Sequence, residues 1–437
     1  MTKLMQRLNP GQAFNGLWRN RDFMRLWTSL TITHFGGQIT FLALPLTAAL
    51  LLDATPFEMG VLTALEAVPF ALFGLFAGVL VDRAPKLPII VWSDIGRALA
   101  LLAVPICAWL GVLSMGVLYV VGFLVGTGGV MGWPAYQVFM TERVGRERLA
   151  EANAKIGISD SASQLIGPGL AGALIQWLTA PFAILLDALS FFASAWILRG
   201  IPRDASDAPK MRARSVIAEI REGLSEIWRN TTLRALAWSI AVWQVFRHAY
   251  FAIVVLFAAR ELGFSPGHVG ALWMLAGLGS LAAAAAAEPL NHRFGFGPTM
   301  LLGLLGTGIA WLVVGAASGG PTLASIVFGL GLAALDFSGM VFFINYLTLR
   351  QAAAPDALRG RVTATMICLT VAPAPLGGLA GGWIAEHAGL RAPMLFAGTG
   401  AILLVLLVAW TSPLLRLRSL AEAEPRRLES VAEELAS

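Results

Sequence analysis

Long hydrophobic runs separated by short polar segments dominate the chain. In the first half they cover about residues 26–52, 57–81, 87–110, 117–140, 152–178 and 181–198. In the second half they are centred near residues 247, 277, 309, 336, 371 and 403. About 20 apolar residues suffice for a helix to cross a bilayer, so the pattern predicts an all-α integral membrane protein with about twelve transmembrane helices in two six-helix halves.

Composition supports a membrane protein rather than a soluble enzyme. The 437 residues are 57% hydrophobic and 13% charged, whereas soluble proteins carry about 25% charged residues. Cys107 and Cys368 fall inside predicted spans, and the sequence has no metal-ligand spacing, no phosphate-binding loop and no Ser-His-Asp arrangement. We therefore expect no metal, no cofactor and no enzymatic activity.

Basic residues mark alternate connections between the predicted spans. They lie near both termini, in the centre of the chain and after every second span, whereas the other connections carry little charge. Because basic residues favour cytoplasmic loops, both termini are predicted to be cytoplasmic in a multi-pass protein of the cell membrane. The net charge of +5 is spread over these loops and forms no single patch, so no nucleic-acid partner is expected.

A central polar segment divides the chain into two halves. We predict an N-terminal half at 1–200, a cytoplasmic linker at 201–231, a C-terminal half at 232–412 and a cytoplasmic tail at 413–437. Within the linker, apolar residues recur at helical spacing, which predicts an amphipathic helix on the membrane surface. These residues are Val216, Ile217, Ile220, Leu224, Ile227 and Trp228. The alternative is a solvated linker whose apolar stripe arises by chance.

A short charged turn after the second span resembles motif A of the major facilitator superfamily, G-x-x-x-D-R-x-x-R/K. The matching residues are Gly78, Asp82, Arg83 and Lys86, and Leu87 stands where the family has a further basic residue. An aspartate there can lie against the positive N-terminal end of another helix. We predict a gate in which Asp82 contacts the start of the eleventh span, near Arg361, when the cytoplasmic side is closed. The alternative is an ordinary basic loop with a helix-capping aspartate.

Glycine-rich segments recur half a chain apart. Residues 169–175 resemble residues 378–384, which indicates an internal duplication. The fifth span also partly matches the glycine-rich antiporter motif of the same family. We predict that its small residues and their counterparts allow close helix packing; they are Gly157, Gly167, Pro168, Gly169, Gly172, Gly378 and Gly381. Two halves related by duplication suit a transporter that exposes one central site alternately to each side.

The whole chain is similar to the major facilitator superfamily, and within it to the drug:proton antiporter branch that holds macrolide efflux pumps and the enterobactin exporter. Residues 133–135, 142–153, 167–169, 186–191 and 358–362 carry this resemblance. It implies a monomeric secondary transporter, in contact with membrane lipids, that exports a hydrophobic or amphiphilic small molecule by alternating access in exchange for protons. A lipid or lysophospholipid transporter of the same fold is the alternative, and a membrane-embedded enzyme is a less favoured third.

Ionisable side chains inside a bilayer are costly and usually functional. Glu66, Asp160 and Asp336 are candidates for proton coupling, because burial disfavours the charge of a lone carboxylate. The alternative for each is a polar lining residue or a hydrogen bond between helices. Arg247 lies at a depth similar to that of Asp336, and we predict a pair between them that changes during transport. A permanent structural ion pair is the alternative.

Further polar residues fall on predicted spans. Asp94 and Arg97 lie one helical turn apart and are predicted to pair with each other or with the gate, and Asp187 is predicted to be structural. In the family that this chain resembles, spans one, four, seven and ten line the central cavity. The resemblance implies that residues of these spans contact the substrate; the candidates are His34, Gln38, Trp133, Tyr136, Gln244, Arg247, His248 and Asn345.

Overall fold

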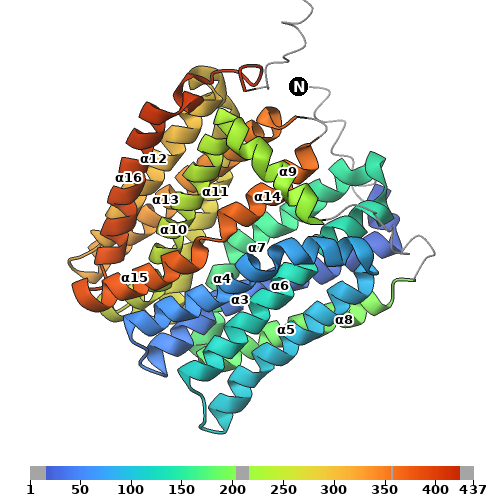
Figure 1. The fold of residues 1–437 in the computed structure, drawn as a ribbon. Coiled ribbons are helices and arrows are strands. Elements are labelled where there is room, and N and C mark those ends of the chain that lie inside the picture. Colours follow the sequence, from blue (N-terminus) through green and yellow to red (C-terminus); the bar gives the residue numbers. More distant parts are fainter. Residues whose placement is uncertain (1–15, 203–215, 356–357, 424–437) are drawn as a thin grey trace, which may run out of the picture. The chain divides into compact units, whose positions relative to one another are not determined.

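The computed structural model describes residues 16–202, 216–355 and 358–423, without the side chains of Leu75, Val79, Asp82, Arg146 and residues 216–220. Within these ranges the chain is helical and contains no strand (Figure 1). The helices of the first half are α3 (Arg21–Leu50), α4 (Pro56–Arg83), α5 (Lys86–Trp109), α6 (Met115–Val144), α7 (Leu149–Leu178) and α8 (Ala180–Arg199). After α9 (Val216–Arg229) come α10 (Thr231–Leu256), a π-helical turn η4 (Phe257–Glu261), α11 (Pro266–Phe294), α12 (Phe296–Gly315), α13 (Pro321–Ala353), α14 (Arg359–Val371), α15 (Ala374–Ala388) and α16 (Ala392–Thr411). Three short 3₁₀ turns, η1 (Gly16–Arg19), η2 (Arg146–Arg148) and η5 (Pro413–Arg416), complete the described part.

Ten of these helical segments are long and apolar enough to cross a membrane by themselves, counted over the described residues. Two 30-residue helices, α3 and α7, are not among them. They correspond to the first and fifth predicted spans and carry more polar side chains than the others. With them, the fold is the predicted all-α membrane architecture of two series of six spans, which is confirmed, whereas the cytoplasmic position of the termini stays a prediction.

The eleventh predicted span is divided in two. Helix α14 ends at Val371 and α15 begins at Ala374, with Pro373 between them and Pro375 in the first turn of α15. Because a proline has no backbone N–H to donate and its ring obstructs the preceding turn, two prolines at this spacing interrupt a helix. The hydrophobic run that the sequence shows as continuous is therefore two helices with a break inside the bilayer.

The first helix of each half begins at the same kind of cap. The side-chain oxygen of Asn20 accepts hydrogen bonds from the backbone N–H groups of Asp22 and Phe23, and that of Asn230 accepts from Thr232 and Leu233. Asparagine is a favoured residue at this position because it satisfies N–H groups that have no partner within the helix. Each cap is the last residue of a Trp-Arg-Asn tripeptide, at residues 18–20 and 228–230, which adds a second repeat to the one predicted from the glycine-rich segments.

Contact clustering divides the chain into two compact units. The first contains the described residues up to 202 together with Ala258–Met274, and the second contains Val216–Phe257 and the described residues from Leu275 onward. The predicted boundaries differ on one point, since they assigned 258–274 to the C-terminal half. This segment is bonded within the first unit: Arg260 donates to Ala49 O at 3.0 Å and to Asp53 Oδ1 at 2.9 Å, and the Gly267 N–H donates to Gln176 Oε1 at 3.0 Å.

Helix pairing is repeated inside the two units. In the first unit α3 packs against α7 and α8, and α5 packs against α6 and α8. In the second unit α10 packs against α15 and α16, and α12 packs against α13 and α16. Helices at corresponding positions of the two series therefore have corresponding partners, as expected for an internal duplication.

Helix α9 forms where the amphipathic helix was predicted, and it packs against α10 and α14. Ile227 is 3% exposed and Trp228 is 53% exposed. Glu222 forms an ion pair with Arg361 of α14. The side chains of Val216, Ile217 and Ile220, and residues 203–215 and 424–437 of the predicted linker and tail, lie outside what the structure describes.

The predicted packing glycines fall into two groups. An added methyl group would lie 2.9 Å from Gly270 Cα at Gly172, 2.6 Å from Ala249 Cα at Gly381 and 2.9 Å from Gln38 Cβ at Gly167. These positions therefore lie at close helix contacts. At Gly172 and Gly381 the neighbouring atoms belong to the backbone of the other helix. At Gly157 an added methyl group would meet nothing within 4 Å, so Gly157 does not serve packing in this structure.

We expect Gly381→Ala to lower the free energy of unfolding by about 1–3 kcal/mol, the usual cost of overpacking. The reason is that the backbone of Ala249 cannot move aside as a flexible side chain would. Gly157→Ala is the matched control, since it adds the same methyl group in open space and gains about 0.5–1 kcal/mol of helix preference. Thermal denaturation of the two purified variants in detergent measures the difference, and equal midpoints would contradict the packing role of Gly381.

Candidate functional site

The two most polar long helices, α3 and α7, pack against each other and bring His34 close to Asp160. His34 Nδ1 lies 3.4 Å from Asp160 Oδ1, and the Gln164 side chain donates to Asp160 Oδ2 at 2.9 Å. On α3, the Gln38 side chain lies one turn beyond His34 and contacts the helix at Gly167. Residues one turn apart on each helix therefore form a polar strip between α3 and α7.

The His34–Asp160 pair is accessible and only partly bonded. The His34 side chain is 19% exposed and that of Asp160 is 45% exposed. The Nδ1 atom of His34 is itself buried and has no hydrogen-bond partner, so the 3.4 Å separation is an ion-pair distance without hydrogen-bond alignment. A carboxylate and an imidazole at this distance can bind or release a proton with little rearrangement.

Glu66 has a different environment. Its side chain is exposed and packs beside Gly122 of α6, and no described residue forms a hydrogen bond or ion pair with it. Glu66 thus has no neighbour among the described residues that would respond to its charge. The role of Glu66 in proton coupling stays a prediction.

Arg247 and Asp336 interact in the second unit without direct contact. Each lies within electrostatic reach of the other, but no ion pair joins them within 4.0 Å. The Arg247 guanidinium lies over two aromatic rings instead, 4.6 Å from the centroid of Phe251 and 5.5 Å from that of Trp243. Such cation–π contacts stabilise an arginine that has no carboxylate beside it.

Several predicted substrate-contacting residues are occupied by internal packing. Tyr136 is 5% exposed and belongs to an apolar cluster with residues of α3, α5 and α8, stacked against Trp133 with ring centroids 6.1 Å apart. Asn345 is fully buried and donates to Val341 O, one turn earlier on its own helix. The Nδ1 atom of His248 lies 2.9 Å from Gln244 O. Tyr136 and Asn345 therefore do not border an open space, whereas Trp133 is 49% exposed.

The predicted gate is only partly described. The side chain of Asp82 lies outside what the structure describes, and its contact with the eleventh span stays a prediction. Arg361 is paired with Glu222. Lys86 is 5% exposed, Arg83 is exposed, and an added methyl group at Gly78 would meet nothing within 4 Å.

A buried polar network connects α3, α5 and α8. The predicted pair is present, with Arg97 donating to Asp94 Oδ1 at 2.6 Å. Asp94 also accepts a hydrogen bond from Ser194 of α8, whose hydroxyl lies 2.6 Å from that of Ser29 of α3. The sequence analysis missed Ser29 and Ser194, because serines are common in helices and carry no spacing signal that points to a distant carboxylate.

Arg97 also serves a second buried carboxylate. Its guanidinium lies 4.2 Å from the ring centroid of Phe191 and within electrostatic reach of Asp187. Asp187 accepts hydrogen bonds from Thr40 of α3 and from Ser190. One arginine thus balances two carboxylates, and hydroxyl groups of α3 and α8 donate to the remaining oxygen atoms.

The sequence is similar to those of known membrane transporters over most of its length. A sequence model of the Major Facilitator Superfamily matches residues 26–369. The MFS-type transporter YfiS of Bacillus subtilis (strain 168) is 28% identical over 407 residues, covering 90% of this chain and 93% of the relative. The multidrug efflux pump Tap of Mycolicibacterium fortuitum is 28% identical over 386 residues, covering 84% of this chain and 92% of the relative.

Solved structures show the same fold at low sequence identity. The nucleoside transporter NupG gives a TM-score of 0.72 at 12% identity, covering 89% of this chain and 99% of the other. The D-xylose-proton symporter gives a TM-score of 0.70 at 14% identity, covering 90% and 98%. At such identities the likeness concerns the fold and leaves the substrate open.

We expect Arg97→Gln to destabilise the protein by about 3–5 kcal/mol, because it leaves buried carboxylates without their counter-charge. Adding Asp94→Asn should recover part of that loss, because the double variant removes one carboxylate together with the arginine. Thermal denaturation and the yield of monodisperse protein in detergent measure both. Arg416→Gln, which changes an exposed arginine, is the control; additive losses from Arg97→Gln and Asp94→Asn would show that the two residues do not act as a pair.

Proposed function

Because this chain belongs to the major facilitator superfamily of transporters, we propose that it exports a hydrophobic or amphiphilic small molecule in exchange for protons, by alternating access. The chain is a multi-pass membrane transporter and not an enzyme. The bacterial origin of the relatives supports a place in the cell membrane. Each unit has its own network of packed helices, so we propose that the monomer is the working form.

The His34–Asp160 pair carries the proposal for proton coupling. It joins two ionisable side chains at 3.4 Å on helices that are too polar to face lipid along their whole length. Ionisable groups inside membrane spans mark proton and substrate pathways. Since Asp160 is 45% exposed, a proton or a ligand can reach the pair without unfolding of the helices.

The exchange at this pair can be described by its charges. With His34 protonated and Asp160 ionised, the pair is neutral overall and holds one exchangeable proton. Release of that proton leaves the negative Asp160, which attracts a cationic group. A cationic amphiphile and a proton would therefore compete for Asp160, and this competition makes the movement of one depend on release of the other.

Efflux of a drug-like molecule is supported by the relative that is named for it. The multidrug efflux pump Tap aligns with most of this chain and most of its own length. The first unit also presents a half-exposed Trp133 on α6, an aromatic surface of the kind that amphiphilic ligands contact. These two observations favour efflux of amphiphiles over transport of small hydrophilic solutes.

We predict that Asp160→Asn abolishes substrate-driven proton release in everted membrane vesicles energised to an inside-acid gradient. A neutral amide has no charge to attract the cationic substrate that displaces the proton of the pair, so release should fall to the level of vesicles without the protein. The measurement is a pH-sensitive dye, read on addition of macrolides, siderophores, cationic dyes and lysolipids. His34→Gln should weaken the release, because it removes the imidazole that carries the exchangeable proton beside Asp160.

Two further carboxylate variants serve as controls for this experiment. Glu288→Gln changes a carboxylate whose side chain is 85% exposed and should behave as wild type. If Asp160→Asn releases protons as wild type does, the His34–Asp160 pair is not the coupling site. If only Glu66→Gln loses proton release, Glu66 is the coupling residue. Movement of lysolipids without any proton release would favour the alternative of a lipid transporter.

We also propose that the separation of Arg247 from Asp336 changes during the transport cycle. Their charges interact across a gap while the arginine rests on Phe251 and Trp243, an arrangement that leaves both groups free to bind another partner. Arg247→Ala and Asp336→Ala should each slow substrate efflux from loaded vesicles while preserving folded protein. Normal efflux by both variants would show that the pair takes no part in transport.

A further inference from the structure

A cavity of about 500 Å³ opens between α5 and α8, two helices of the first unit that lie side by side (Figure 1). Its lining comes from the N-terminal end of α5 and the C-terminal end of α8. The lining residues are Leu87, Pro88, Val91, Trp92, Arg199 and Ile201. The volume is within the usual range of small-molecule sites, about 300–1,000 Å³. This cavity lies apart from His34 and Asp160, which are on α3 and α7.

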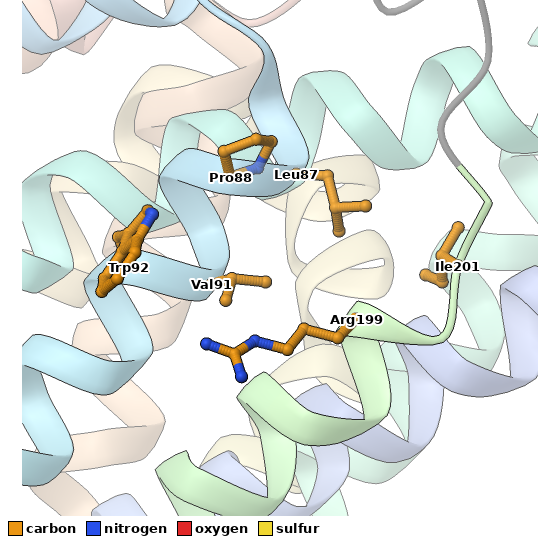
Figure 2. A pocket seen from close by; sticks show the side chains of 6 residues that line it. All are labelled: Leu87, Pro88, Val91, Trp92, Arg199 and Ile201. Carbon is orange, nitrogen blue, oxygen red and sulfur yellow. The ribbon is translucent and has the colours of Figure 1, made fainter.

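Arg199 supplies the only charge among these lining residues, and it has no protein partner. It forms no hydrogen bond or ion pair with any residue that the structure describes. Figure 2 shows its side chain extending from α8 toward Val91 of α5, away from Ile201. Helical side chains tilt toward the helix N-terminus, so from the end of α8 this exposed arginine points back along the helix toward α5.

The depth of the site matches the headgroup region of a bilayer. Val91 and Trp92 are five and six residues beyond the start of α5 at Lys86, which places them about 8–9 Å along the helix axis. The headgroup region occupies roughly 5–8 Å on each side of the hydrocarbon core. Trp92 is 66% exposed, and exposed tryptophans are typical of the boundary between headgroups and hydrocarbon. For a helix that starts at the membrane surface, this depth is the boundary between headgroups and hydrocarbon, within reach of lipid phosphates for a long side chain such as that of Arg199.

The surrounding charge favours an anion with a net negative charge. Arg25 and Arg143 bond the chain just after α8, donating to Gly200 O and to Pro202 O. Asp22 is the acidic partner of both. With Arg199, three arginines therefore lie at the helix ends that surround the last residues of α8. It is also the end that the distribution of basic loops predicts to be cytoplasmic, and basic pockets between helices on that side bind anionic headgroups.

We propose that the cavity between α5 and α8 binds the headgroup phosphate of an anionic phospholipid, held by Arg199 and by the apolar and aromatic walls at Leu87, Val91 and Trp92. The acyl chains continue along the exposed apolar surface of the two helices, where Trp196 and Leu99 are 78% and 57% exposed. A zwitterionic headgroup suits the site less well, because its ammonium adds positive charge beside the arginine. The site is independent of the proposed proton coupling.

Native mass spectrometry of the full-length protein in detergent tests the proposal, with phosphatidylglycerol or phosphatidylcholine titrated in. Wild type should retain phosphatidylglycerol in preference to phosphatidylcholine. Arg199→Gln should weaken phosphatidylglycerol binding about tenfold, since hydrogen bonds to charged groups are worth that much or more. Arg199→Lys should keep most of the binding, and Arg416→Gln, at an exposed arginine of the second unit, should keep all of it.

The aromatic wall has its own matched pair of variants. Trp92→Leu should weaken binding of phosphatidylglycerol, whereas Trp410→Leu, at an exposed tryptophan of α16 in the second unit, should have little effect. Arg199→Lys and Trp92→Leu also carry the test if Arg199→Gln does not fold. Unchanged binding of phosphatidylglycerol by Arg199→Gln would overturn the proposal. If that variant does not fold, unchanged binding by Trp92→Leu and equal retention of both lipids by wild type would overturn it. Displacement of the lipid by millimolar inorganic phosphate would identify the site as one for free phosphate and would overturn it as well.

Discussion

The cost of placing a charged or polar side chain against lipid shapes this protein more than any single contact does. The most polar long helices, α3 and α7, pack against each other, and their ionisable side chains His34 and Asp160 lie close together. Asp94 and Asp187 are buried among hydroxyl groups and share one arginine. Within the described residues, the charges at the centre of the spans thus have neighbours of opposite charge, hydroxyl partners, aromatic rings or access to solvent.

The exposed fraction of a polar side chain distinguishes a group that only stabilises the fold from one that can bind a proton or a ligand. Asp94 is 5% exposed and its oxygen atoms are occupied by Arg97 and Ser194, so its charge is fixed in place. Asp160 is 45% exposed, and its histidine neighbour is near but not aligned for a hydrogen bond. Both are aspartates in membrane helices, yet only the second can exchange its partner without breaking the packing around it.

The sequence predicts those features that depend on one helix at a time. Bilayer thickness sets the length of a span, so hydrophobic runs locate the helices, and one-turn spacing predicts the Asp94–Arg97 pair. Contacts between helices are harder to predict. His34 and Asp160 were each singled out but not as a pair, and the ion pair between Arg361 and Glu222 was not predicted. Hydropathy does not encode which helices are neighbours or, as for Tyr136 and Asn345, which faces they bury.

The polarity of α3 also bears on how the protein enters the membrane during synthesis. A translocon releases a segment into lipid according to its own apolarity, and α3 falls short of the level that the following helix, α4, reaches. The capping box of Thr55 and Glu58 forms the start of α4 within a few residues of the end of α3. The two segments are therefore suited to leave the translocon as a hairpin, with the second helix drawing the first into the bilayer before α7 emerges from the ribosome to cover its polar side.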